Sequence, residues 1–257
     1  MGVDFPVVLR DDRTERKLSQ LELAARSGTT QRHLSFLERG RSVPGRGLVI
    51  RLAESLELPL RERNELLLAA GYAPPYRQTA LDDPALAHVR AALEHILSGH
   101  LPYPAIIVDR YGDLVAANKA FELITEGAAV DLTGPGSNVY RLALHRDGIA
   151  PRVLNLPVWG RHIVERLRQA SSRTADDRLA VLHAEMLSHL LDHDRPGDPA
   201  EDYLGFAVPL RLRSSRGDLE LMTTVTTFAT AVDITLAELK LEAFLPADKR
   251  TADLLAR

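Results

Sequence analysis

The feature that most constrains the fold is a pair of short helix signatures separated by one glycine. Ser19 stands three residues before Glu22, the spacing of a capping box, which predicts a helix that begins at Gln20. Ser27-Gly28 ends this helix, because glycine readily takes the left-handed conformation of a tight turn. Thr29 or Thr30 then caps a helix over residues 31–38. Two helices joined in this way predict a helix-turn-helix.

The residues around this pair continue the helical pattern. Apolar residues at helical spacing predict further helices over about 6–16, 48–56 and 60–70. Gly71 and the pair Pro74-Pro75 then end the helical region. We therefore predict an all-α domain of five helices over residues 1–73, a Pro-rich linker over 74–82 and a second domain over 83–257.

The charge of the N-terminal region suits DNA. Residues 26–51 hold six arginines and one acidic residue, Glu38, whereas acidic residues outnumber basic ones after residue 76. If Leu21, Leu23, Leu34 and Leu37 pack the two helices together, the polar side of the second helix stays exposed to read base edges. The candidate DNA-binding residues are Gln20, Thr30, Gln31, Arg32, Ser35, Phe36, Arg41 and Ser42, with Thr30, Arg41 and Ser42 expected at phosphates.

The second domain has a different pattern. A helix is expected over 83–97, followed by strands over 105–108 and 114–117 and by mainly helical residues up to about 193. Alternating apolar residues then predict three strands over 204–213, 219–229 and 234–245. This order predicts an α+β, PAS-like domain with a five-stranded antiparallel sheet and helices over one face.

Two parts of the chain resemble known families. Residues 18–24 (LSQLELA) and 28–40 (GTTQRHLSFLERG) resemble the XRE group of phage-repressor-type domains. Residues 109–118 (DRYGDLVAAN), 138–142 (NVYRL), 145–148 (HRDG), 150–152 (APR), 224–228 (TVTTF) and 242–248 (EAFLPAD) resemble the ligand-binding domain of MmyB-like regulators.

The resemblance carries functional expectations. It implies base contacts by Gln31, Arg32 and Phe36, a base or phosphate contact by Gln20, and binding to a double-stranded operator as a homodimer. It also implies a PAS-like pocket for a small hydrophobic, fatty-acid-like effector, with Trp159 displaced from the usual place of a tryptophan. The expected function is therefore sequence-specific regulation of transcription controlled by such an effector.

Pocket residues can be proposed from the expected sheet and helix starts. Phe206, Leu221, Val225 and Leu239 are expected to line the pocket on the sheet side. Four polar residues near helix starts, Asn118, Asn138, Arg141 and His145, are candidates to fix one end of the ligand. Each also has a structural interpretation: Asn118 can cap a helix, Arg141 can form an internal salt bridge, and His145 can be an ordinary hydrogen-bonded histidine.

Several functional classes are disfavoured. The chain has no cysteine, which removes disulfides, thiolate metal sites and thiol catalysis. Glu185, His189 and His193 share a helical face, but no glutamate lies between the histidines as a hydrolytic zinc site requires, so no metal and no other cofactor is expected. No Gly-x-Ser-x-Gly motif or phosphate-binding loop occurs, so an enzyme is not expected either.

Two expectations concern location and partners. No apolar run of 18 residues and no secretory pattern occur, which predicts a cytoplasmic protein without membrane contact. The alternative function is a DNA-binding antitoxin or scaffold whose second domain binds a protein. An enclosed apolar pocket would favour the sensor, and a flat exposed apolar patch would favour the protein partner.

Overall fold

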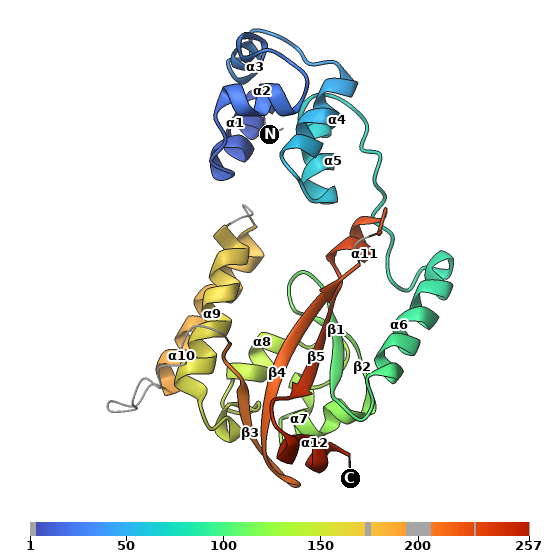
Figure 1. Cartoon of the computed structure of the whole chain (residues 1–257), viewed down its shortest axis with the longest axis vertical. Helices are drawn as coiled ribbons and strands as arrows, with labels where there is room; N and C mark the ends of the chain where they lie inside the picture. Colours follow the sequence, from blue (N-terminus) through green and yellow to red (C-terminus); the bar gives the residue numbers. More distant parts are fainter. Residues whose placement is uncertain (1–3, 173–175, 194–206, 229, 257) are drawn as a thin grey trace. The chain divides into compact units, whose positions relative to one another are not determined.

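The computed structural model describes residues 4–172, 176–193, 207–228 and 230–256 (Figure 1). Contacts between residues divide the chain into two compact units, Met1–Ala80 with Ala229–Ala237, and Leu81–Phe228 with Glu238–Arg257. Each unit is described by itself. The segment Ala229–Ala237, which joins two strands of the second unit, thus packs with the first unit, and no sequence pattern indicated this.

The first unit contains the five predicted helices over its first 80 residues. They are α1 (Phe5–Glu15), α2 (Gln20–Arg26), α3 (Gln31–Glu38), α4 (Arg46–Ser55) and α5 (Leu60–Ala69). Their core contains Leu23, Leu34, Leu37, Leu52 and Leu66, all fully buried. Leu21 does not pack between the helices as expected, because its side chain lies on the outer face of α2 and is 61% exposed.

The helix ends follow the predicted capping. The Ser19 hydroxyl accepts a hydrogen bond from the Glu22 amide at 3.1 Å, and the Glu22 carboxylate accepts one from the Ser19 amide at 2.8 Å. Thr30, rather than Thr29, caps α3 by accepting a hydrogen bond from the His33 amide at 3.1 Å. Gly28 takes φ +65° in the turn between α2 and α3, which is the conformation that the sequence predicted.

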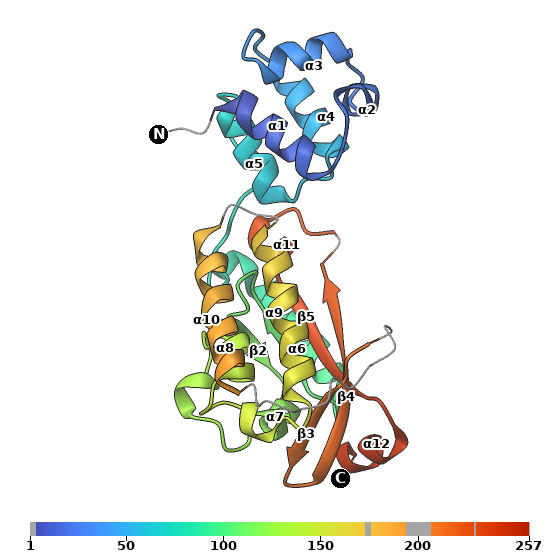
Figure 2. The ribbon, with the colours of Figure 1, turned by 90° about the vertical axis from the view of Figure 1, so that its left-hand side faces the viewer.

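The described part of the second unit contains the predicted five-stranded antiparallel sheet, in the order β2-β1-β5-β4-β3. Its strands are β1 (Ala105–Val108), β2 (Leu114–Ala117), β3 (Leu210–Ser214), β4 (Gly217–Thr227) and β5 (Lys240–Pro246). Figures 1 and 2 show α9 (Leu156–Ser172) and α10 (Asp177–His193) together on one side of this sheet and α6 (Ala87–Gly99) on the other.

Shorter helices complete the structure, and of these α11 lies mainly in the segment Ala229–Ala237 of the first unit. The remaining α-helices of the described chain are α7 (Glu122–Thr125), α8 (Val139–Leu144), α11 (Ile234–Glu238) and α12 (Lys249–Leu255). Four 3-10 turns cover η1 (Pro84–Leu86), η2 (Lys119–Phe121), η3 (Val130–Leu132) and η4 (Ala150–Arg152). The main core lies between the sheet and helices α7 to α10, and Leu144, Leu167, Met186, Leu212 and Leu221 are among its most deeply buried members.

One predicted strand is wrong in its first half. Residues 234–238 form α11, and β5 begins only at Lys240. The reason is local, because the Asp233 carboxylate accepts a hydrogen bond from the Thr235 amide at 2.9 Å and so starts a helical turn. The predicted strand over 204–213 is described only from residue 207, and β3 begins after Pro209, which cannot donate to a strand ladder.

Candidate functional site

The first candidate surface is the exposed side of α3. Leu34 and Leu37 point into the core with no exposure, while Gln31 and Arg32 on the opposite side are exposed. Ser35 and Phe36 lie half-buried at the edge of this surface, and the Arg32 guanidinium stands 5.4 Å from the centre of the Phe36 ring. The polar side of α3 is therefore exposed, and its contact with a groove of DNA stays a prediction.

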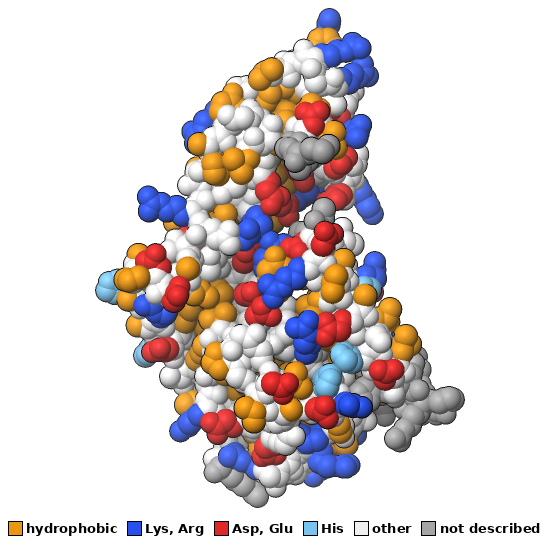
Figure 3. All heavy atoms as spheres, turned by 180° about the vertical axis from the view of Figure 1, so that it is seen from behind, with side chains coloured by type: hydrophobic (Ala, Val, Ile, Leu, Met, Phe, Trp, Pro, Cys, Tyr) orange, Lys and Arg blue, Asp and Glu red, His pale blue; other side chains and the backbone are white. Residues whose placement is uncertain are grey.

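Exposed arginines surround this helix. Arg32, Arg39, Arg41 and Arg46 are all exposed, and none of them forms an ion pair with another residue that the structure describes. In Figure 3, blue side chains gather at the end of the helical unit where Figure 1 places α3. Positive charge without internal partners is available for phosphate groups.

His33 on α3 contacts a hydroxyl group on each side of the helix. His33 Nδ1 lies 3.0 Å from the Thr29 hydroxyl, and His33 Nε2 lies 3.4 Å from the Ser42 hydroxyl. The amide of Arg41 donates to the Phe36 carbonyl at 2.8 Å, so the loop after α3 is held close to it. The three residues expected to contact phosphates lie at the two ends of α3: Thr30 before it, and Arg41 and Ser42 after it. Their contacts with phosphates stay a prediction.

Gln20 has a partner that sequence reasoning did not reveal. Its side-chain amide donates to the Glu38 carboxylate at 2.7 Å, and Arg13 donates to the same carboxylate at 2.6 and 3.0 Å. Glu38 is only 8% exposed, and its hydrogen bond raises the pKa of Arg13. Gln20 therefore joins α1, α2 and α3 through Glu38, and its role at DNA stays a prediction.

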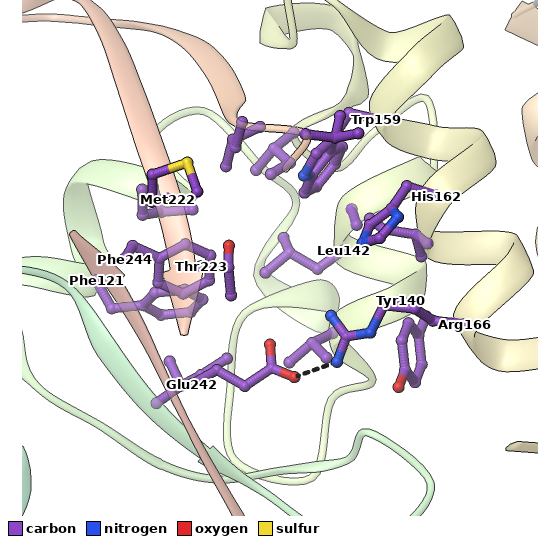
Figure 4. A pocket seen from close by; sticks show the side chains of 18 of the residues that line it. Phe121, Tyr140, Leu142, Trp159, His162, Arg166, Met222, Thr223, Glu242 and Phe244 are labelled. Carbon is purple, nitrogen blue, oxygen red and sulfur yellow. Dashed lines mark ion pairs between the residues drawn. The ribbon is translucent and has the colours of Figure 1, made fainter. Parts of the chain in front are cut away.

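The second candidate site is a cavity of about 260 Å³ between the sheet and helices α8 and α9 (Figure 4). Its lining is mainly apolar, with a few polar side chains at one end. The described residues that line it are Ile106, Phe121, Ile124, Val139, Tyr140, Leu142, Ala143, Ile149, Trp159, His162, Ile163, Arg166, Ala207, Val208, Leu210, Met222, Thr223, Glu242 and Phe244.

Of the predicted pocket residues, Trp159 lines this cavity. Leu221 is buried in the main core but does not border the cavity, and Val225 is 42% exposed near the far end of β4. Leu239 is buried between α11 and β5, also outside the lining. Phe206 lies outside the described residues. Strand alternation alone did not identify the lining because it does not show which face of β4 meets α9.

The predicted polar residues lie outside the cavity lining. Asn118 bonds the Ala105 amide and the carbonyls of Leu97 and Tyr103. Asn138 caps α8, where its side-chain oxygen accepts from the Tyr140 amide at 3.1 Å. Both asparagines are buried and hold backbone segments together.

Arg141 and His145 also have partners outside the cavity. Arg141 donates two hydrogen bonds of 2.7 Å to Glu185, and this pairing lowers the pKa of Glu185. The His145 ring meets the edge of the His189 ring at 5.0 Å between centroids. Within the described residues, no group of three histidine or carboxylate side chains is arranged to hold a metal ion. The side chain of His193 is outside the described part.

The polar end of the cavity was not recognised from the sequence. The Glu242 carboxylate, on β5, lies 3.7 Å from the Arg166 guanidinium on α9, and Figure 4 shows the two facing each other beside Tyr140. Burial raises the pKa of Tyr140 to about 12 and raises that of Glu242, while it lowers the pKa of His162. Glu242 stands in an alternating strand where the sequence suggested an outward position, so no local signal marked it as buried.

Comparisons with known proteins cover both units. Residues 89–257 match the family model described as the MmyB-like transcription regulator ligand binding domain, and residues 9–63 match the model described as helix-turn-helix. No helix among the described residues is long and apolar enough to span a membrane.

Two similar proteins share the N-terminal part. The HTH-type transcriptional regulator y4dL of Sinorhizobium fredii (strain NBRC 101917 / NGR234) is 42% identical over 74 residues, which are 29% of this chain and 35% of that protein. The match thus spans about a third of that relative's length. The crystal structure of the restriction-modification controller protein C.AhdI from Aeromonas hydrophila matches at 34% identity, covering 23% of this chain and 89% of that chain with a TM-score of 0.22.

Proposed function

The chain belongs to the family of transcription regulators with an MmyB-like ligand-binding domain, and we propose that it reads a specific operator through α3 under the control of a small hydrophobic effector. The observation that carries the DNA-binding part is the exposed Gln31–Arg32 side of a helix whose other side is fully buried. Glutamine can pair with adenine and arginine with guanine in the major groove.

The proposed binding form is a homodimer on a roughly palindromic operator. One reading helix of eight residues contacts few base pairs, and repressors of this kind gain specificity by placing two such helices about 34 Å apart. Gln31, Arg32, Ser35 and Phe36 would face base edges, while Thr30, Arg41 and Ser42 would bond the flanking phosphates.

The effector proposed for the cavity is fatty-acid-like. Its lining includes Phe121, Trp159, Ile163 and Phe244, which suit an aliphatic tail, and its charged groups are at one end, which suits an amphiphile. The cavity of about 260 Å³ is near the lower limit of ordinary small-molecule sites, which favours a short or medium chain.

The proposed control passes through the connection between β4 and β5. Both strands line the cavity, through Met222 and Thr223 on β4 and through Glu242 and Phe244 on β5. The segment that joins them carries Asp233, whose carboxylate accepts hydrogen bonds from the Thr79 amide at 3.1 Å and the Thr79 hydroxyl at 2.6 Å.

The same connection is bonded at a second point. The Ile234 amide donates to the Arg77 carbonyl at 2.8 Å, and Asn64 of α5 bonds the backbone of Tyr76 through both its side-chain atoms. A shift of β4 or β5 on ligand binding would therefore pull on the segment 76–79 that follows the DNA-binding helices.

The test has two parts. Genomic DNA fragments retained by the purified chain at physiological salt would define the operator, and its affinity would then be measured at fixed salt with and without medium-chain lipids. We expect a specific fragment and a several-fold change in affinity. Retention of random fragments alone would contradict operator reading, and an unchanged affinity with a ligand seen bound by native mass spectrometry would contradict effector control.

A second candidate function has one observation in its favour. Val181 and Leu191 on α10 are 66% and 61% exposed, and Leu187 is 40% exposed, so this helix presents apolar side chains outward. Such a surface suits a protein partner, as in an antitoxin or scaffold, or a second copy of the chain. The molar mass of Leu191→Glu in solution separates these possibilities. If the surface binds a second copy of the chain, the purified variant should dissociate to a monomer. If it binds a different protein, the molar mass of the purified variant should equal that of wild type.

A further inference from the structure

The polar end of the cavity contains a carboxylate to which none of the described residues donates a hydrogen bond. Glu242 is 9% exposed, and no described residue donates a hydrogen bond to its side-chain oxygens. Its nearest counter-charge is Arg166 at 3.7 Å, which is an ion pair too long for a hydrogen bond (Figure 4). The Glu242 side chain is 12% exposed and lines the cavity, so its oxygens keep acceptor positions that a molecule in the cavity can fill.

The other charged and titratable groups around Glu242 come close to balance. Lys240 lies two residues before it on β5, and burial lowers the pKa of Lys240 while Glu242 and Asp109 raise it. Tyr140 from α8 has a pKa of about 12 and stays neutral, and His162 from α9 has a pKa lowered by burial and by Arg166. Two cations, Arg166 and Lys240, thus stand against two carboxylates, Glu242 and Asp109, which leaves no net positive charge for a further anion.

We propose that Glu242 and Arg166 form the head-group site of the cavity and select an amphiphile whose head is uncharged and carries both a donor and an acceptor. The donor bonds the Glu242 carboxylate, and the acceptor bonds the Arg166 guanidinium. This inference rests on the proposed function, since it assigns a head-group chemistry to the same effector cavity.

A consequence follows for carboxylic acids. Two carboxylates that share one small buried site cannot both stay ionised at low cost, because the second negative charge is repelled by the first. A fatty acid therefore binds together with one proton, held between its own carboxyl and Glu242. An amide of the same chain length already carries an N–H donor and a carbonyl acceptor, so its binding takes up no proton.

Octanoate and octanamide are suitable probes because they differ only in the head. For the full-length chain, titration calorimetry between pH 6 and 8 should show the dissociation constant of octanoate rising with pH, approaching about tenfold per pH unit where Glu242 of the free protein is ionised and one proton is taken up. Octanamide should bind with an almost constant dissociation constant over the same range. Repeating the octanoate titration in two buffers of different ionisation enthalpy counts the protons directly.

Glu242→Gln provides the matched test of the residue. Glutamine keeps the size of the side chain and removes its charge, so octanoate should bind this variant more tightly than wild type at pH 8, with little dependence on pH. Glu220→Gln makes the same change on the neighbouring strand β4, outside the cavity lining, and should leave the octanoate profile of the wild type unchanged.

The outcomes separate the two proposals. If octanoate and octanamide both bind with the same flat pH profile, in wild type and in Glu242→Gln, the head-group assignment is overturned while the hydrophobic effector stands. If neither probe binds the wild type at any pH, the proposed effector class fails and this inference fails with it. Because the wild-type pH profiles are decisive alone, the test does not depend on the variant folding.

Discussion

At the residue scale, two of the exposed arginines at α3, Arg32 and Arg41, differ in their surroundings. Arg32 lies on α3 itself and stacks over the Phe36 ring, which holds its guanidinium at the exposed face. Arg41 is exposed in the loop after α3, where its backbone amide bonds the Phe36 carbonyl and no described residue bonds its side chain. A fixed guanidinium suits bidentate contact with guanine, and a loop guanidinium suits a phosphate.

This difference predicts two kinds of DNA-binding defect. Arg32→Ala should cost about 1–3 kcal/mol at one base position and relax specificity there, whereas Arg41→Ala should weaken binding to all sequences alike and reduce the salt slope by about one. Fluorescence anisotropy on an operator, a set of single-base variants and random DNA at several salt concentrations measures both effects. Equal losses on operator and random DNA for both variants would refute the assignment of roles.

A second residue-scale prediction concerns pH. Burial between α1 and α5, beside Glu62, raises the pKa of Asp12 to about 7, although Arg16 opposes this. The folded state therefore holds a proton that the unfolded chain releases above its ordinary pKa of 3.8, so this group lowers the free energy of unfolding as the pH rises towards 7.

Asp12→Asn should remove this dependence. The variant is expected to be more stable than wild type at pH 8 and nearly equally stable at about pH 3, where Asp12 is mainly protonated in both states. Urea denaturation of the first unit, followed by circular dichroism at both pH values, measures the difference. Asp11→Asn, with a side chain 59% exposed next in sequence, is the control and should show little effect at either pH. A gain of the same size at both pH values would exclude titration of Asp12 as the cause.

At the element scale, the turn between α2 and α3 depends on backbone conformation rather than on space. Gly28 has φ +65°, and nothing lies within 4 Å of the position that a Cβ would take. Gly47, inside α4, also has room for a Cβ, with only the tip of Arg51 at 3.7 Å, but its backbone is helical. The two glycines therefore differ in conformation and not in crowding.

Alanine at these positions should have opposite effects. Gly28→Ala is expected to lower the free energy of unfolding by about 1–2 kcal/mol, because a side chain is disfavoured in the left-handed region. Gly47→Ala is expected to raise it by up to about 0.5 kcal/mol, because alanine is favoured over glycine in helical backbone and Gly47 lies in the first turn of α4. Thermal and urea denaturation of the full-length variants test this. A Gly28→Ala protein as stable as Gly47→Ala would show that the turn relaxes without cost.

At the scale of the whole molecule, the hydrogen bonds between Thr79 and Asp233 predict how effector binding changes operator affinity. Asp233→Ala removes the acceptor of both Thr79 hydrogen bonds and should reduce the effect of octanoate or octanamide on operator affinity, while ligand affinity itself stays the same. Hydrogen exchange of residues 76–80 should become faster.

Asp218→Ala is the control for this prediction. Asp218 is an exposed aspartate on β4, and its loss should change neither exchange in the linker nor the response to ligand. If Asp233→Ala retains the full response of operator affinity to ligand, the β4–β5 connection is not the route of control.

The sequence by itself determined the features that depend on neighbouring residues. Ser19, Glu22, Thr30 and Gly28 set the ends of α2 and α3 through bonds within a few residues, so the reading helix and its exposed polar side were predictable. Family resemblance likewise identified both domains, because their motifs are short and contiguous.

Only the tertiary structure decided which side chains meet across the sheet. Glu242 and Arg166 are far apart in the sequence and were missed, whereas Asn118 and Asn138, expected in the pocket, hold backbone segments elsewhere. Strand alternation predicts which residues share a face of the sheet, but whether that face is buried depends on the helix that packs over it. The cavity arises from that packing, and so does the pairing of its charges.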